Sequence, residues 1–208
     1  MPGILTEEQI RAAAHENGLD YPALRAVIQV ESGGSGYLPD GRVKILFERH
    51  VLWQRLKIPS RNINPRTLAE DRPDLCGPRW DPRAYPYGSQ SYQWERVYGI
   101  VSWAQSHAAA VWESYKKAAY ESCSWGLFQQ MGYHYASAGY PNVYTFKHAL
   151  EESEANQLAA ILKWMAGNGL LDRLRDHEWT AFVTGYNGSG QVRKYRTRLT
   201  AAFRQFGG

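Results

Sequence analysis

The chain has few cysteines, no long apolar run and little imbalance of charge. Only 2 of its 208 residues are cysteine, Cys76 and Cys123, too few for a disulfide scaffold and without the paired spacing of a zinc site. No apolar run approaches the roughly 20 residues that span a bilayer. The first helix-like segment, which ends at Gly18, lacks the basic start and apolar middle of a signal peptide. We therefore expect two unlinked thiols, no metal site and no stable membrane insertion.

Motifs for nucleotide chemistry are also missing. Neither G-x-x-x-x-G-K-S/T nor G-x-G-x-x-G occurs, and the six histidines show no H-E-x-x-H pattern. The formal net charge of +4 suits an anionic surface but identifies none. Four basic side chains within residues 193–198 are more typical of a solvated helix face than of a dedicated binding patch. Since the aromatic residues are dispersed, we expect no nucleic-acid partner, and we expect no cofactor.

Aromatic residues are what the chain has in excess. They make up 13% of it, as 14 Tyr, 8 Trp and 6 Phe, whereas the 44% hydrophobic and 21% charged fractions are those of an ordinary folded protein. Such a content indicates either a large aromatic core or a groove lined with flat faces for sugars or bases. The length fits one domain, which we expect to cover residues 1–208.

Helical patterns cover most of the chain and predict a mainly α fold. Thr6 and Gln9 form a capping-box pattern at the first helix, and Asp20 with Pro22 begins a second helix that ends before Gly34. The only strand signal predicts at most a small β hairpin near residues 36–47. Residues 59–88 form a proline-rich excursion with little periodicity, which predicts a long irregular segment. Further helices are expected over residues 49–56, twice within 92–122, and over 152–166, 170–175, 178–186 and 191–206.

Glu31 conflicts with the pattern around it. Leu24, Val27 and Ile28 predict a buried face on the second helix, and position 31 falls on that face. Burial and the negative end of the helix dipole both disfavour a charged carboxylate, so they raise its pKa. A carboxylic acid that stays protonated is what a glycosidase needs to protonate a leaving oxygen. The alternative is a glutamate that reaches solvent at a frayed helix end or pairs with an arginine.

Glu31 also begins the first of several distinctive segments. Glu31-Ser-Gly-Gly-Ser-Gly36 is followed by Lys44-Ile-Leu-Phe-Glu-Arg-His50, by Ser124-Trp-Gly-Leu-Phe-Gln-Gln-Met-Gly132 and by Thr184-Gly-Tyr-Asn-Gly-Ser-Gly190. Each alone fits a helix junction. In this order, they resemble the N-acetylmuramidase catalytic domain of bacteriophage endolysins, which is related to goose-type lysozymes and soluble lytic transglycosylases. The resemblance covers nearly the whole chain.

The resemblance implies a lysozyme-like helical fold and cleavage of the β-1,4 bond between N-acetylmuramic acid and N-acetylglucosamine in peptidoglycan. Glu31 occupies the position of the family's catalytic glutamate. Residues expected to line the substrate groove are Ser124, Phe128, Gln129, Tyr133, Tyr186 and Asn187. Amides and phenols suit this role because they offer donors and acceptors to acetamido and hydroxyl groups without carrying charge.

The second catalytic carboxylate has two candidates. Glu48 lies within the resembling segment, where it either activates water or braces the groove by pairing with Arg49 or His50. Asp40 lies in a Pro-Asp-Gly sequence, and ordinary turn chemistry is the preferred interpretation there. A lytic transglycosylase needs no such base, because the muramyl 6-hydroxyl attacks internally. A module that binds glycan without cleaving it is a further alternative, against which the acid at Glu31 argues.

The resemblance also implies where and how the protein acts. We expect a monomer that is made in the host cytoplasm without a signal peptide and reaches periplasmic peptidoglycan after holin-type release or delivery. Cys76 and Cys123 could pair if the periplasm oxidises them.

The placement of the aromatic residues favours sugars over bases. Trp94, Trp103 and Trp164 fall on helical stripes and are predicted to be core. The rings predicted to stand near the groove are Tyr37, Trp125, Phe128, Tyr133 and Tyr186.

Overall fold

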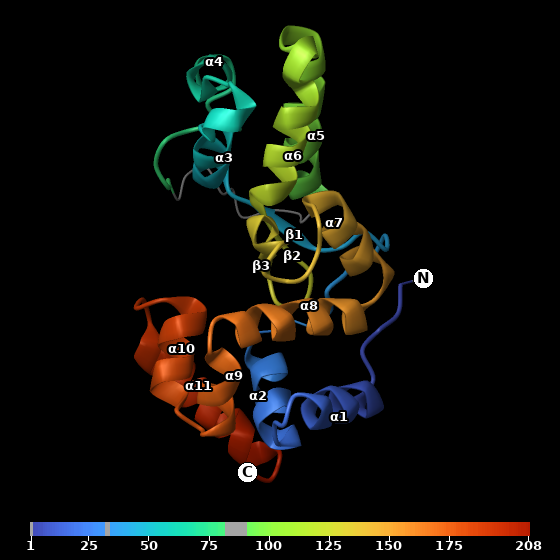
Figure 1. Ribbon diagram of the computed structural model, residues 1–208, viewed down its shortest axis with the longest axis vertical. Helices are drawn as coiled ribbons and strands as arrows, with labels where there is room; N and C mark the ends of the chain where they lie inside the picture. The colour runs from blue at the N-terminus through green and yellow to red at the C-terminus, as the bar shows by residue number, and fades with distance from the viewer. Residues whose placement is uncertain (1, 32–33, 82–90) are drawn as a thin grey trace.

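The computed structural model describes residues 2–31, 34–81 and 91–208, and most of them are helical (Figure 1). Three short strands form one small sheet. The α-helices are α1 (Glu7–Glu16), α2 (Tyr21–Glu31), α3 (Arg49–Leu56), α4 (Pro65–Asp71), α5 (Ser91–His107), α6 (Trp112–Glu121), α7 (Val143–Glu152), α8 (Glu154–Gly167), α9 (Leu170–Arg175), α10 (Trp179–Asn187) and α11 (Val192–Gln205). The strands are β1 (Ile45–Phe47), β2 (Cys123–Trp125) and β3 (Gln130–Met131), and 3₁₀ helices cover Pro59–Arg61, Ala109–Val111 and Gly132–His134. The predicted mainly α class is confirmed.

Two hydrophobic clusters divide the molecule into an upper and a lower lobe. We use "upper lobe" for the sheet with α3 to α7 and "lower lobe" for α1, α2 and α8 to α11. In Figure 1, α5 and α6 rise at the top, α1, α2 and α11 lie at the bottom, and α8 runs across the middle. The loop between β2 and β3 inserts Leu127 and Phe128 into the lower cluster. This loop therefore connects the two cores.

N-terminal capping residues in the sequence explain where the first two helices begin. The predicted capping box is present, because the Thr6 hydroxyl accepts from the Gln9 amide and the Gln9 side chain accepts from the Thr6 amide. Asp20 accepts from the backbone N–H of Ala23 at 2.6 Å and so caps α2. On α2, Leu24 and Val27 are almost fully buried, each worth roughly 1.5–3 kcal/mol. This packing fixes the helix whose last residue is Glu31.

The sheet differs from the predicted hairpin. A bridge between Tyr37 and Val43 lies inside the predicted range. The strand itself, β1, pairs antiparallel with β2, with Phe47 opposite Cys123, and β3 pairs on the other side of β2. The partner of β1 is distant in sequence, so no local pattern indicated it. The result is that the Glu48 and Ser124 segments are joined through one small sheet.

Two helices were not expected from periodicity. The excursion at 59–88 was predicted to be irregular, yet it contains α4, which Asn64 caps and Pro65 begins, and Leu68 on it is fully buried. Residues 82–88 of the excursion lie outside the described part of the chain. Helix α7 was also missed, although Asn142 caps it by accepting from two backbone amides. For the seven-residue α4, cap chemistry was the main available signal, whereas α7 also has an apolar face, with Val143, Phe146 and Leu150 buried, which the sequence prediction overlooked.

The two cysteines are free and buried, which confirms the expectation of unlinked thiols. Burial raises the pKa of the Cys76 thiol to about 12, so it is not a reactive thiolate at neutral pH. Among the described residues, no helix is long and apolar enough to cross a membrane.

Candidate active site

Glu31 faces a cavity of about 470 Å³ between the two lobes. Glu31 is the last residue of α2, which belongs to the lower lobe. The opposite wall comes from the β2–β3 hairpin and the 3₁₀ helix that follows it. The described residues that line the cavity are Glu31, Phe128, Gln129, Gln130, Met131, Tyr133, His134, Ile161, Trp164, Tyr186, Asn187 and Tyr195. Five of the predicted groove residues, all except Ser124, are thus brought together with Glu31.

Burial dominates the electrostatics of Glu31. It raises the pKa of this carboxyl above its ordinary value of 4.5, because a charged form is poorly solvated there. Two weaker effects lower it: the Asn187 side-chain amide donates to Oε1 at 3.3 Å, and the positive charge of Arg198 lies nearby. The net shift is upward, so the structure agrees with the direction deduced from the helix pattern.

The raised pKa makes a stability prediction. The pKa of the Glu31 carboxyl is higher in the folded protein than in the unfolded chain. The folded state therefore becomes less stable as the pH rises from the unfolded-state pKa through the folded-state pKa, because the carboxyl must ionise where it is buried. Glu31→Gln is neutral at every pH, so it should be more stable than the parent at about pH 8 and gain nothing near pH 4. Thermal unfolding at both pH values measures this. A gain of the same size at both pH values would contradict it.

Two buried polar side chains in the cavity have no partner among the described residues. The Tyr186 hydroxyl forms no hydrogen bond, and neither polar atom of the Gln130 side-chain amide forms one. Burial raises the pKa of Tyr186 well above its usual range, so its phenol stays neutral. Buried polar groups are nearly always hydrogen-bonded, so these unpaired atoms beside a cavity are exceptions.

Gln129 is held by the protein instead. Its Oε1 accepts from the Ser124 hydroxyl at 2.9 Å and its Nε2 donates to the carbonyl of Gly126 at 2.8 Å. Gln129 also adopts a left-handed backbone conformation, with φ of 47°. Ser124 itself is buried and is not among the residues that line the cavity. The structure therefore places Ser124 behind Gln129, and it leaves Gln130 with the unpaired amide.

Aromatic rings form a continuous wall of the cavity. Tyr133 contacts His134 edge to face at 4.4 Å, His134 stacks on Trp164 at 5.2 Å, and Trp164 meets Tyr186 at 5.8 Å. Burial lowers the pKa of His134, so this ring is neutral at neutral pH. Trp164 was predicted to be core, but it is half-buried and lines the cavity. The apolar stripe on α8 indicated that Trp164 faces the interior, but it could not show whether the ring is packed in the core or lines a cavity.

Two rings predicted near the groove belong to the core. Trp125 is 1% exposed and donates its indole N–H to the carbonyl of Tyr120, and Tyr37 donates its hydroxyl to the carbonyl of Leu150. Trp94 and Trp103 are buried, as predicted. Proximity to a motif was thus a weaker guide than the direction in which each side chain points.

Neither candidate for the second carboxylate lines the cavity. Glu48 lies at the start of α3, with its carboxylate 3.5 Å from Nδ1 of His50. Asp40 accepts from the backbone and side chain of Arg42 in the turn after Leu38, and this arginine lowers the pKa of the Asp40 carboxyl. Both side chains thus make the local contacts named as their alternatives to catalysis. Among the described lining residues, Glu31 is the one carboxylate.

Two buried side chains on α8 hold the loops around the cavity. The Gln157 amide accepts from the backbone N–H of Leu127 at 2.6 Å and donates to the carbonyl of Leu150 at 2.8 Å. The Glu154 carboxylate accepts from the backbone N–H of Gly36 at 2.7 Å and from that of Leu5 at 2.9 Å. These two residues attach the segment after Glu31 and the β2–β3 loop to the same helix.

The part of the chain that the structure describes contains no group of three His, Cys, Asp or Glu side chains placed to hold a metal ion. The residues that the sequence patterns did not single out are Gln130, Met131, His134, Ile161, Trp164 and Tyr195. Gln130 and Met131 lie inside the Ser124–Gly132 segment, so their position was signalled but their role was not. The others become neighbours only through the fold.

A helical two-lobed fold with Glu31 in a cleft of amides and aromatic rings fits a glycoside hydrolase of the lysozyme type. Residues 20–207 match the family model Muramidase, described as N-acetylmuramidase, and the chain belongs to this family. It is therefore a peptidoglycan hydrolase that acts as an N-acetylmuramidase.

A solved structure supports the same placement. The chain is similar to the crystal structure of the Burkholderia AP3 phage endolysin, with a TM-score of 0.81 and 32% sequence identity. The match covers 99% of this chain and 73% of that one. A comparison with curated proteins gives no match.

Proposed function

We propose that Glu31 is the general acid that protonates the glycosidic oxygen between N-acetylmuramic acid and N-acetylglucosamine. The observation that carries this proposal is the burial of Glu31 in the cavity, which raises the pKa of its carboxyl. A raised pKa keeps the proton available near neutral pH. The position of Glu31 at the start of the motif series that resembles the muramidases supports the same role.

Asn187 determines which oxygen of Glu31 can carry the proton. Its Nδ2–H donates to Oε1, so Oε1 acts as an acceptor and the proton resides on Oε2. The acid is thereby oriented as well as protonated. After proton transfer, the amide of Asn187 also stabilises the carboxylate that remains.

Substrate recognition falls to neutral groups. Tyr186 and Gln130 have buried polar atoms without partners, which suit the hydroxyl and acetamido groups of a sugar. Tyr133, which is exposed, offers ring surface to the sugar faces, and Trp164 extends that surface, whereas Phe128 supports the cavity from the core. Gln129 and Ser124 act together: Ser124 fixes the amide of Gln129 at the edge of the cavity.

The attacking group distinguishes hydrolysis from the transglycosylase reaction. The family is hydrolytic, which makes water the attacking group. The one carboxylate among the described lining residues favours, in contrast, the internal attack of a lytic transglycosylase, which requires no second base. We propose hydrolysis, in which the Glu31 carboxylate left by the first proton transfer or a carboxylate beyond the cavity wall activates the water.

The products of digestion distinguish these reactions. Purified sacculi digested by the protein should release muropeptides with reducing N-acetylmuramic acid ends, which mass spectrometry identifies. Muropeptides that end in 1,6-anhydromuramic acid would replace hydrolysis by the transglycosylase reaction. Ends that are reducing N-acetylglucosamine would contradict the muramidase assignment itself.

The similarity to a phage endolysin supports a role in lysis of a bacterial host. In this role the protein reaches the peptidoglycan through a holin-type pore or by delivery. We propose that it acts as a monomer, with residues 1–208 as a single catalytic domain, because the family model matches residues 20–207 as one unit.

A further inference from the structure

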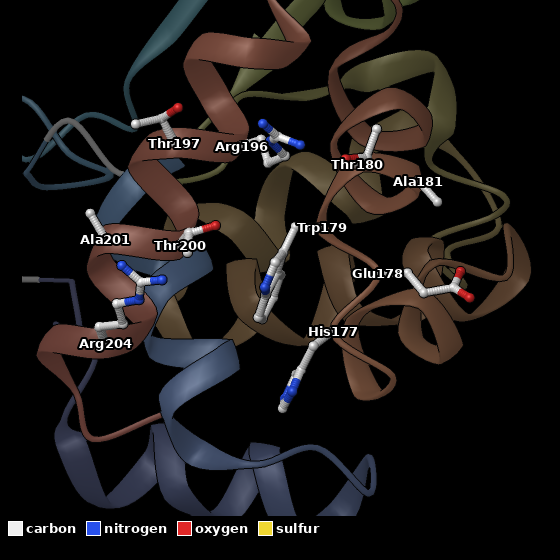
Figure 2. A pocket seen from close by; sticks show the side chains of 10 residues that line it. All are labelled: His177, Glu178, Trp179, Thr180, Ala181, Arg196, Thr197, Thr200, Ala201 and Arg204. Atoms are coloured by element: carbon white, nitrogen blue, oxygen red, sulfur yellow. The ribbon is translucent and has the colours of Figure 1, made fainter.

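A second cavity, of about 680 Å³, lies at the opposite end of α10 from the active site (Figure 2). The start of α10 and the residues just before it form one wall, and the outer face of α11 forms the other. Trp179, at the start of α10, points into the space between the two walls (Figure 2). Tyr186 and Asn187, at the end of the same nine-residue helix, line the active site. At a rise of 1.5 Å per residue, the two ends of α10 are about 12 Å apart.

The ring of Trp179 is held in a fixed position. It stacks on His177 with ring centroids 5.0 Å apart and planes 15° from parallel, and it packs against Phe203 at 4.9 Å. The imidazole of His177 in turn contacts the carboxylate of Asp20 at 2.5 Å. The indole N–H of Trp179 donates to none of the residues that the structure describes. A rigid, half-buried indole with an unused donor is a platform for a flat apolar face that carries polar edges, as a sugar ring does.

Two arginines stand beside this platform without partners. Arg196 and Arg204 are exposed on α11, and neither forms a hydrogen bond or an ion pair with the described residues, whereas Arg198 on the same helix donates to the carbonyl of Val30. The nearby acidic groups are occupied, since Glu178 pairs with Arg173 and Asp20 contacts His177. The cavity is therefore positively charged. The hydroxyl of Thr200, between the two arginines in sequence, adds a neutral donor and acceptor.

We infer that this second cavity binds a peptidoglycan strand outside the active site, with a sugar ring against Trp179 and stem-peptide carboxylates on Arg196 and Arg204. Guanidinium groups bind carboxylates in a bidentate manner, and an aromatic platform beside them selects a glycan over a simple polyanion. The inference rests on the peptidoglycan substrate but not on the role of Glu31. Binding here holds the insoluble polymer near the cleft, so it raises the effective concentration of cleavable strands.

The test separates polymer binding from catalysis. The double variant Arg196→Gln/Arg204→Gln should cleave intact sacculi roughly tenfold more slowly, and it should cleave a short soluble glycan of two disaccharide units at the parental rate. Arg193→Gln/Lys194→Gln, which removes the same two charges from α11 outside both cavities, is the matched control and should change neither rate. Trp179→Leu should reproduce the loss on sacculi, provided that its unfolding temperature matches the parent.

Binding is measured directly in the Glu31→Gln background, in which sacculi are not degraded. Co-sedimentation with sacculi should weaken roughly tenfold in the double arginine variant. Equal rates of the parent and the double variant on sacculi would overturn the inference, as would equal losses on both substrates. Binding to phosphatidylglycerol vesicles tests whether the cavity is a general polyanion site. The inference would also be overturned if the double arginine variant lost vesicle binding and sacculus binding in parallel while Trp179→Leu kept both. Failure of Glu31→Gln to abolish cleavage of the short glycan would contradict the catalytic proposal alone.

Discussion

Replacement of Glu31 by glutamine should lower the rate of peptidoglycan cleavage roughly 10³-fold while the protein stays folded. Glutamine has nearly the same shape and keeps an oxygen that can accept from the Asn187 amide at the position of Oε1. It cannot donate a proton to a leaving oxygen, so the loss should appear in kcat rather than in KM. Release of dye from labelled sacculi measures the rate, and thermal unfolding checks the fold.

Glu16 provides the matched control. It ends α1 as Glu31 ends α2, but its side chain is exposed. Glu16→Gln therefore makes the same chemical change at the same position of a helix, without the burial. It should retain the parental rate. Retention of more than about a tenth of the parental rate by Glu31→Gln would remove Glu31 from the mechanism.

Replacement of Gly126 by alanine should destabilise the protein by about 3 kcal/mol and impair activity. Gly126 has a φ of 66°, which costs any residue with a Cβ roughly 1–2 kcal/mol. An added Cβ would also lie 2.4 Å from Oε1 of Gln157. That amide is buried and bonded to the Leu127 N–H and the Leu150 carbonyl, and these bonds would break if it moved away. Urea-induced unfolding measures the loss.

The glycine control lies on α8. Gly167 ends this helix, is exposed and has no atom within 4 Å of an added Cβ. Gly167→Ala should leave stability unchanged or raise it by up to about 1 kcal/mol, because alanine favours the helix. If Gly126→Ala is as stable as Gly167→Ala, the β2–β3 loop does not depend on its contact with Gln157. Gly126→Ala should also raise KM, since Phe128 and Gln129 lie on the same loop as Gly126.

The helical frame was predictable because its signals are local. Thr6, Gln9 and Asp20 cap the helices that their spacing indicated, and Leu24 with Val27 marks the buried face of α2. The sheet was not predictable in the same way. β1 and β2 are separated in sequence by α3 to α6, and neither three-residue strand has an alternation long enough to specify its partner.

The candidate site shows the same division. Glu31 was recognised because a carboxylate stands where an apolar pattern expects a buried residue, and the raised pKa in the structure has the same cause. The sequence could not tell whether Gln129 or Gln130 has a side-chain amide without a partner. In the structure the Gln129 amide is bonded to Ser124 and Gly126, which leaves the Gln130 amide unpaired. The apolar stripe on α8 predicted that Trp164 belongs to the core, whereas the structure shows it stacked on His134.

The attachment of two loops to one turn of α8 has a consequence for how the protein unfolds. Glu154 and Gln157 lie on α8 of the lower lobe, and they accept from the backbone N–H groups of Gly36, in the segment before β1, and of Leu127, in the β2–β3 loop of the upper lobe's sheet. Separation of the two lobes would leave both buried side chains with unpaired polar atoms, which is unfavourable for each of them. The two lobes are therefore coupled into one cooperative unit, and the cleft between them is a rigid part of the molecule rather than a seam along which it separates.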